Sequence, residues 1–462
     1  MSDIICISPI DGSEVARRPL MSDAALAHTL VAARAAQREW AQVPIAERAT
    51  AMLRFLEAMR TLNPEIVPEL AWQMGRPVRY GGEFRSFEER VHYMVSIAEQ
   101  ALAPVRPLDS KPGFERLIRR EPLGLVLVVA PWNYPFLTAV NTIVPALMAG
   151  NAVILKHAAQ TILVGERFAE AMAMADLPPG VFSNVVLSHD QTAQLLKSGA
   201  INHASFTGSV AGGKAIEQAA AGTFTTLGLE LGGKDPAYVR ADAVLDYAVE
   251  NLVDGAFFNS GQSCCGVERI YVHADVYDRF VERFVALTSE YVLGNPLDAA
   301  TSLGPMAATR FAELVRAHTA EALAKGAHAH LDPAAFPADK PGTPYLAPQV
   351  LTNVDHSMRV MVEESFGPVV GIMKVANDAE ALALMNDSPY GLTASLWTSD
   401  LDAAQALGAQ IATGTVYMNR CDYLDPGLVW TGVKDTGRGA SLSALGYETL
   451  TRPKSYHLRF QI

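Results

Sequence analysis

Apolar residues in the first hundred positions recur at helical spacing. Four of them in the segment AMLRFLEAMR follow the i, i+3, i+4, i+7 pattern of one helix face: Met52, Phe55, Leu56 and Met59. Further upstream, Ser22 or Asp23 stands where a side-chain cap would begin an earlier helix. The pattern predicts that the first hundred residues are helical.

From residue 123 the pattern changes to short apolar runs that are rich in β-branched residues and separated by helical stretches. These runs are LGLVLVVA (123–130), NAVIL (151–155), VFSNVVL (181–187) and HASFT (203–207). Apolar strands that alternate with helices are typical of a parallel sheet covered on both faces. We therefore predict an α/β fold with a doubly wound, Rossmann-like cofactor domain.

The alternation of strands and helices restarts after the sequence ELGGK. A helical pattern over about 243–257 precedes the strand-like ERIYV, and another helix is expected over about 275–288. Near the end of the chain, GLTASLWTS and GTVYMNR have the apolar, β-branched composition of strands. This second series predicts a second α/β domain.

Two segments, 113–124 and 452–462, look like strands that belong to neither core. Exposed strands pair readily with other chains, which predicts an oligomer. The expected division of the chain is a cofactor domain at 1–102 and 123–231, a catalytic domain at 232–434, and oligomerisation strands at 103–122 and 435–462.

Composition narrows the function classes. The formal net charge of −12 argues against binding to nucleic acids or to anionic membranes, which needs clustered basic residues. The N-terminus lacks a signal-like apolar core, and no segment approaches about 18 uninterrupted apolar residues. The four cysteines contain no C-x-x-C pair and the eleven histidines show no metal-ligand spacing. We expect a cytoplasmic protein without a metal site.

Two of the cysteines stand side by side in FFNSGQSCCGVERI, residues 257–270. Adjacent residues do not easily adopt relaxed disulfide geometry, and a free cysteine is by default a small buried apolar residue. A nucleophilic cysteine instead needs a lowered pKa and room for a substrate, and the turn-like approach NSGQ fits an exposed loop. From these residues alone, the pair could be buried apolar residues or could contain a nucleophile. Nothing in the segment shows whether Cys264 or Cys265 would be that nucleophile.

Two polar residues are candidates for acid–base or electrostatic roles. Glu230 lies between Leu229 and Leu231, whose apolar side chains would raise its pKa toward that of a general base. Its alternative reading is an exposed glutamate on an edge strand. Asn133, in PWNYP, follows a predicted strand, where an amide can stabilise an oxyanion at a ligand site. Its alternative reading is a turn residue between two prolines.

Three further positions suggest a nucleotide site. Lys156 and Ser209 both follow predicted strands, and Ser209 opens a helix whose free N–H groups would bind phosphate. The glycines around Gly208 do not spell G-x-G-x-x-G, so a surface lysine and a simple helix cap stay as alternatives. Glu364, before SFGPV, would accept hydrogen bonds from a ribose or, with Glu363, form a solvated acidic pair.

Together and in their order, these motifs resemble the NAD(P)-dependent aldehyde dehydrogenases over nearly the whole chain. The motifs are SPIDGSEV, PWNYP, GNAVILK, FTGS, LELGGK, FNSGQSC, EESFGPV, NDSPYGL and VKDTGRG. No single motif is specific, but their co-occurrence at ordered positions is. The resemblance implies a cysteine-dependent oxidoreductase that uses NAD or NADP, acts on an aldehyde and forms a homodimer or homotetramer.

The resemblance also implies a role for each matching residue. Cys264 is the nucleophile, Glu230 activates water, and Asn133 holds the oxyanion together with the backbone N–H of Cys264. The implied cofactor-binding residues are Trp132, Lys156, Ala159, Gly208, Ser209, Glu364 and Phe366. The implied substrate-pocket residues are Tyr134, Asn141, Ser263, Cys265 and Trp430.

The chain departs from the family pattern at two informative places. KHAA replaces the frequent K-P-x-E, so Ala159 stands where a glutamate contacts the 2′-hydroxyl of NAD and repels a 2′-phosphate. We therefore expect that the protein accepts NADP. In its stronger form, this hypothesis predicts that NADP is preferred over NAD. In VWTGVK, Trp430 replaces the usual phenylalanine and Thr431 replaces a glycine, which changes the usual loop.

The substrate is the least constrained part of this interpretation. Polar Thr138 and Asn141 in the implied pocket indicate small or medium polar aldehydes, semialdehydes included, with Arg420 as a candidate for binding a carboxylate. Three alternatives are a CoA-acylating relative, a cysteine hydrolase and a non-catalytic NAD(P)-binding member of the fold. The presence of Glu230 argues against a CoA-acylating relative, because such relatives commonly lack the water-activating glutamate.

Overall fold

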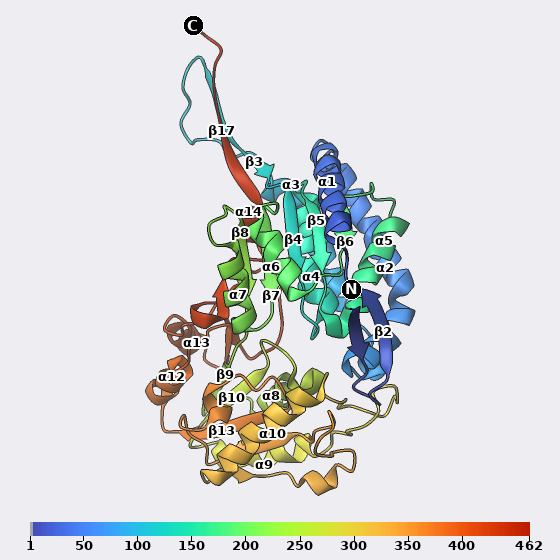
Figure 1. Ribbon diagram of the computed structural model, residues 1–462. Coiled ribbons are helices and arrows are strands. Elements are labelled where there is room, and N and C mark those ends of the chain that lie inside the picture. Colours follow the sequence, from blue (N-terminus) through green and yellow to red (C-terminus); the bar gives the residue numbers. More distant parts are fainter. Residues whose placement is uncertain (1–2) are drawn as a thin grey trace.

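The computed structural model describes residues 3–462 and contains two α/β units and one projecting two-stranded ribbon (Figure 1). The first unit holds a six-stranded sheet in the order β16-β8-β7-β4-β5-β6. Its parallel strands are β4 (Leu125–Val129), β5 (Ala152–Lys156), β6 (Phe182–Asn184), β7 (His203–Thr207) and β8 (Thr226–Glu230). The parallel sheet predicted from the apolar runs is confirmed.

Helices cover both faces of this sheet because its central strands are apolar on both sides. Val126 and Val128 pack with α2 (Ile45–Met74), α3 (Phe84–Ala101), α4 (Pro135–Met148) and α5 (Ile162–Met174). Leu125 and Leu127 point to the other face, toward α1 (Asp23–Trp40), α6 (His189–Lys197) and α7 (Val210–Ala220). Of the two predicted caps, Ser22 and Asp23, Ser22 caps α1 by accepting a hydrogen bond from the Ala25 N–H at 3.2 Å.

The second unit holds a seven-stranded sheet in the order β11-β12-β13-β10-β9-β14-β15. Its strands are β9 (Asp235–Val239), β10 (Val267–His273), β11 (His328–Ala329), β12 (Gln349–Thr352), β13 (Val369–Val375), β14 (Thr393–Trp397) and β15 (Thr415–Met418). Its longer helices are α8 (Leu245–Phe257), α9 (Tyr277–Thr288), α10 (Thr309–Ala324), α12 (Asp378–Asn386) and α13 (Leu401–Gly408). The predicted second α/β series is therefore present.

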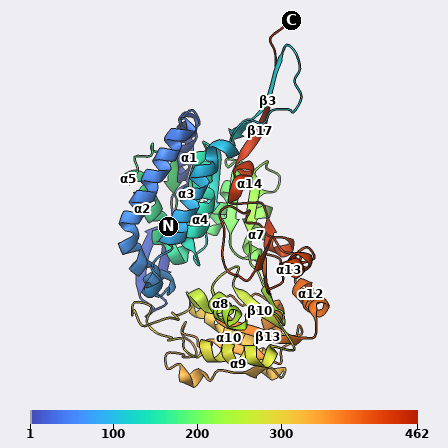
Figure 2. The ribbon, with the colours of Figure 1, turned by 180° about the vertical axis from the view of Figure 1, so that it is seen from behind.

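The two strands that were expected outside either core pair with each other. β3 (Phe114–Pro122) and β17 (Thr451–Arg459) form an antiparallel ribbon that projects from the first unit, next to α14 (Ser443–Thr449) (Figures 1 and 2). The pairing of this ribbon with another chain stays a prediction, as do the domain boundaries. Within residues 3–462, no helix is both long and apolar enough to span a bilayer.

The expectation of a purely helical start is wrong for the first residues described. β1 (Asp3–Ile7) and β2 (Glu14–Pro19) form an antiparallel hairpin before α1 begins. Gly12 takes a φ of 78° in the connection, a conformation that glycine adopts without strain. The Asp-Gly pair between two alternating runs is a hairpin signal, and the helical periodicity further along the chain obscured it.

Candidate active site

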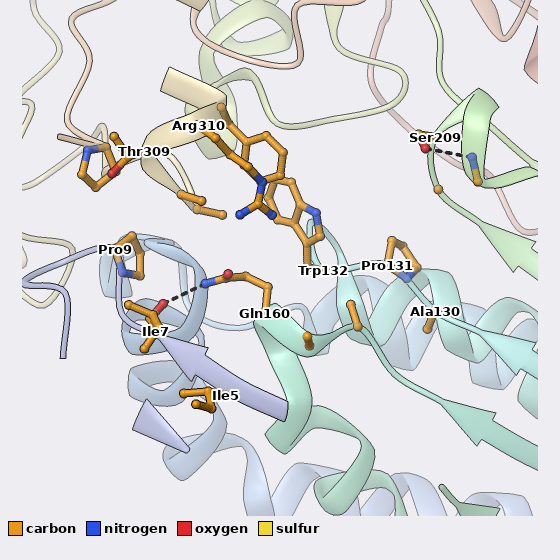
Figure 3. Close-up of a pocket in the computed structure, with 18 of the residues that line it drawn as sticks. Ile5, Ile7, Pro9, Ala130, Pro131, Trp132, Gln160, Ser209, Thr309 and Arg310 are labelled. Carbon is orange, nitrogen blue, oxygen red and sulfur yellow. Dashed lines mark hydrogen bonds between the residues drawn. The ribbon is translucent and has the colours of Figure 1, made fainter. Parts of the chain in front are cut away.

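The chain order of the first sheet creates a binding cleft. From β4 the chain continues outward to β5 and β6, whereas β7 and β8 lie on the opposite side of β4. In such sheets, ligands bind where the strand order reverses, at the carboxyl ends of the strands. A cleft of about 1300 Å³ lies there, and Figure 3 shows Trp132 and Ser209 facing it. Five predicted cofactor residues line it: Trp132, Lys156, Ala159, Gly208 and Ser209.

The first turn of α7 offers a phosphate site within the cleft. Ser209 is the N-cap, and its Oγ accepts a hydrogen bond from the Gly212 N–H at 3.1 Å. A Cβ on Gly208 or Gly212 would lie within 2.7 Å of the Phe206 ring, so glycine keeps this approach compact. The free N–H groups and the positive end of the helix dipole suit a pyrophosphate.

The adenosine side of the cleft carries one buried cation. Lys156 is 6 % exposed, and burial lowers the pKa of its ammonium group. The neighbouring His157 is neutral at physiological pH, because burial lowers its pKa to about 4. Ala159 also lines the cleft, and its side chain carries no charge.

Parts of the cleft come from segments that the sequence did not indicate. The β1–β2 hairpin contributes Ile5 and Ile7 to its wall, and Gln160 donates from Nε2 to the Ile7 carbonyl at 3.0 Å (Figure 3). On the opposite wall the Arg310 guanidinium stacks on Phe311, whose ring in turn stacks on Trp132 at 5.0 Å. In the sequence, only the Asp-Gly turn signal could have indicated the wall that the β1–β2 hairpin forms.

The two remaining predicted cofactor residues, Glu364 and Phe366, do not line the cleft. The Phe366 ring meets Trp132 edge-on at 5.6 Å, whereas Glu364 accepts a hydrogen bond from the Gly233 N–H at 3.0 Å. Burial raises the pKa of Glu364 to about 7. The Glu268 carboxylate, paired with buried Lys234, accepts from the Phe366 N–H at 2.9 Å and thereby holds this loop.

The cysteine pair follows a backbone segment of unusual conformation. Asn259, Ser260 and Gly261 take φ values of 53°, 57° and 69°, a left-handed run that non-glycine residues adopt only under tertiary constraint. After this run Cys264 is partly exposed and Cys265 is buried. The hydrogen bond with Cys264, followed by burial, raises the pKa of the Cys265 thiol. The environment therefore disfavours a Cys265 thiolate.

A buried polar network holds Asn133 beside this loop. Its Nδ2 donates to the Gln262 carbonyl at 3.2 Å, two residues before Cys264. Its own carbonyl accepts from Asn259 Nδ2 at 3.2 Å and from the Arg76 guanidinium, which pairs with Glu83. Because an amide nitrogen carries two hydrogens, the bond to Gln262 fixes its plane and leaves a second donor.

Glu230 ends β8 beside a small cavity of about 30 Å³. Its carboxylate accepts from the Ser441 hydroxyl at 2.5 Å and from the Thr207 hydroxyl at 3.2 Å. Burial raises the pKa of Glu230, and these two hydrogen bonds partly oppose that effect. His203 behaves as a core residue, because it bonds the Thr226 and Ser205 hydroxyls at 2.8 and 3.1 Å.

The predicted pocket residues lie around these groups at different depths. Asn141 shares the cavity behind Glu230 and accepts from Arg90 Nη1 at 3.0 Å. Cys265 and Trp430 belong to one apolar cluster, against which Tyr134 and Cys264 pack. Ser263 donates to Asp422, a residue that the sequence did not identify. Arg420 is exposed with its guanidinium 3.3 Å from the Tyr423 ring centroid.

Comparisons with known proteins agree with this geometry. The model of the "Aldehyde dehydrogenase family" matches residues 2–456. A succinate-semialdehyde dehydrogenase [NADP(+)] of Deinococcus radiodurans is 33% identical, over 97% of this chain and 93% of its own. A betaine aldehyde dehydrogenase 2 of Rhizobium meliloti is 31% identical, over 99% and 95%. The crystal structure of an aldehyde dehydrogenase from Brucella melitensis biovar abortus superposes with a TM-score of 0.95, at 27% identity, over 100% and 95%.

Proposed function

Because the chain belongs to the aldehyde dehydrogenase family, we propose that it oxidises a small or medium-sized polar aldehyde to the acid, with semialdehydes among the candidates. The observation that supports this most is the junction of cleft and cysteine loop. Ala307 lines the cleft, and its N–H donates to Gln262 Oε1 at 2.8 Å, two residues before Cys264. The loop that carries the proposed nucleophile is thus hydrogen-bonded to a residue of the proposed dinucleotide cleft.

In the proposed reaction the Cys264 thiolate attacks the aldehyde carbon. The second hydrogen of Asn133 Nδ2 and the backbone N–H of Cys264 stabilise the oxyanion of the resulting thiohemiacetal. A nicotinamide cofactor held by the residues of the cleft would accept the hydride that leaves the carbonyl carbon, which becomes the carbon of a thioester on Cys264. Glu230 takes a proton from the water that attacks this thioester, and the carboxylic acid and the Cys264 thiolate are released.

Turnover of an aldehyde panel with NAD and NADP in parallel tests this proposal. Reduction of the cofactor with release of a free acid, in the absence of CoA, is the expected result. Formation of a CoA thioester as the only product, with no free acid, would favour the CoA-acylating alternative. Cofactor binding without turnover of any aldehyde would favour a non-catalytic member of the fold, and hydrolysis of an ester or amide alone would favour a cysteine hydrolase.

Asn133→Ala is expected to lower kcat by roughly 10²-fold, because one oxyanion donor is lost. The KM for the cofactor should change little, since the phosphate and adenosine sites lie at β5 and α7. Steady-state kinetics with one aldehyde measure both constants. A variant with full kcat would contradict the proposed role of Asn133.

We further propose that the enzyme accepts NADP and assembles as a homodimer or homotetramer through the β3–β17 ribbon in the cytoplasm.

Ala159→Glu should shift the ratio of kcat/KM for NADP over NAD toward NAD by roughly tenfold or more, because the new carboxylate repels a 2′-phosphate. Ala159→Gln adds similar bulk without charge and is the matched control. An unchanged ratio in Ala159→Glu would contradict this role.

A further inference from the structure

A buried arginine contacts both the segment PWNYP, which carries Asn133, and the cysteine loop. Helix α2 ends at Gly75, whose φ of 84° is the left-handed conformation of a helix C-cap, and Arg76 follows directly. A Cβ on Gly75 would lie 2.4 Å from the Pro305 carbonyl oxygen, so glycine allows the chain to turn tightly against the segment before α10. Arg76 itself is 3 % exposed. The fold therefore fixes where the Arg76 side chain begins and removes its charge from water.

Three contacts of the Arg76 guanidinium hold these two segments together. Its Nη2 donates to the Asn133 carbonyl at 2.5 Å, and its Nε donates to Asn259 Oδ1 at 3.2 Å. The guanidinium also lies over the Tyr134 ring, with 4.7 Å between its carbon and the ring centroid. Asn259 in turn donates from Nδ2 to the carbonyls of Asn133 and Gln262, at 3.2 and 3.3 Å. One guanidinium and one amide thus connect the main chain of Asn133 to the cysteine loop.

The counter-charge of Arg76 holds the chain just after PWNYP. Glu83 Oε1 accepts from Arg76 Nη1 at 2.5 Å, and both side chains of this ion pair are at most 3 % exposed. Glu83 Oε2 accepts from the N–H groups of Phe136 and Leu137, in the first turn of α4, at 3.0 and 2.7 Å. A carboxylate at a helix N-terminus satisfies free N–H groups and is stabilised by the helix dipole. The ion pair therefore fixes the chain on both sides of Tyr134.

The arrangement requires an arginine rather than any cation. The three guanidinium nitrogens face three separate partners, which belong to Asn133, Asn259 and Glu83. A lysine carries a single nitrogen at the end of its side chain, so it can keep the charge beside Glu83 but cannot reach all three partners. Because a buried carbonyl without a donor is costly, the Asn133 main chain would shift to find another partner.

Arg76 acts on the chemistry only through another residue. Of the residues described, those that line the cofactor cleft and the small cavity beside Glu230 do not include Arg76. Its contact is to the main chain of Asn133, whose side-chain amide bonds the Gln262 carbonyl and keeps one hydrogen free. The direction of that hydrogen depends on the main chain from which the amide projects. A displacement of about 1 Å in such a group can lower a rate by about 10²-fold.

We propose that Arg76 is a positioning residue, which holds the Asn133 main chain so that the free amide hydrogen meets the oxyanion of the adduct on Cys264. This inference rests on the proposed function and adds a residue to its mechanism. Arg76→Lys keeps a positive charge beside Glu83 and loses the fork of donors. It should lower the rate of the first turnover by roughly tenfold or more and change the KM for the cofactor by less than about threefold.

A double-mutant cycle with Asn133→Ala tests the proposal. Rapid mixing with cofactor and an aldehyde that the wild type oxidises gives the rate of the first turnover for the wild type, both single variants and the double variant. In the Asn133→Ala background, Arg76→Lys should cost less than about threefold, because the donor that Arg76 positions is already absent. Arg79→Lys, the matched control, makes the same exchange three residues later at an exposed position and should change neither rate nor KM.

Two results would overturn the inference while leaving the proposed function intact. One is an equal loss from Arg76→Lys in both backgrounds, which a purely structural role or an effect on Cys264 would produce. The other is a first turnover that Arg76→Lys does not slow. If Arg76→Lys does not fold, Glu83→Gln enters the same cycle, because it keeps an oxygen for the α4 N–H groups and removes the charge that holds Arg76; the same dependence on Asn133 is expected. A wild type that oxidises no aldehyde would instead overturn the proposed function, and the inference with it.

Discussion

Cys264→Ser is expected to abolish aldehyde oxidation, with a loss in kcat of roughly 10⁴-fold or more. The serine hydroxyl has a pKa far above that of a thiol, so almost no anionic nucleophile is present at neutral pH. The thioester intermediate also cannot form. Rapid mixing with cofactor and aldehyde should show no burst of reduced cofactor, and mass spectrometry should detect no acylated protein.

Cys265→Ser is the matched control, because it makes the same chemical change one residue later. Its hydroxyl can still donate to Asp422 Oδ1, the partner of the Cys265 thiol at 2.9 Å. Activity should therefore stay within about threefold of the wild type. If Cys265→Ser lost activity while Cys264→Ser kept it, the assignment of the nucleophile would be wrong.

Glu230→Gln is expected to stop the reaction after its first half. Without a base to take a proton from water, hydrolysis of the thioester should slow by roughly 10³-fold. The first turnover should remain fast, so one equivalent of reduced cofactor per active site forms in a burst and acyl-enzyme accumulates. A variant without a burst would place Glu230 in the first half-reaction instead.

The environment of Glu230 also predicts the acidic side of the pH profile. Only the ionised carboxylate can accept the proton, and burial raises the Glu230 pKa above its usual value. Activity limited by hydrolysis should therefore fall as the pH drops through this raised pKa. In Ser441→Ala, which removes the hydrogen bond at 2.5 Å to the ionised form, this limb should move to higher pH. A limb that does not move would exclude Glu230 as the titrating base.

Much of the site could be predicted because local patterns carry it. The apolar runs at 123–130, 151–155 and 203–207 predicted parallel strands, and Lys156 and Ser209 follow two of them directly. In a parallel sheet such positions meet at one edge, so their joint presence in the cleft follows from strand direction alone. The motif order supplied the family, which the comparison over residues 2–456 confirms.

Other features depended on contacts that no local pattern records. Ser441 reaches Glu230 across 211 positions, and Asp422 reaches Cys265 across 157. The β1–β2 hairpin showed only a two-residue turn signal, yet it forms a wall of the cofactor cleft. Asp422 and Ser441 lie outside the helices and the named strands, where hydrophobic periodicity is absent and side-chain direction is set by packing.

The cysteine pair shows where the two kinds of information divide. By itself the sequence determined that two adjacent thiols follow a small, turn-like segment, and its motif frame assigned Cys264 as the nucleophile by resemblance. The tertiary structure decided their different environments: Cys264 is partly exposed, whereas Cys265 is buried and bonded to Asp422. Sequence spacing places neighbouring side chains only relative to their own backbone, and the solvent access and charge that each one meets arise when distant loops pack around it.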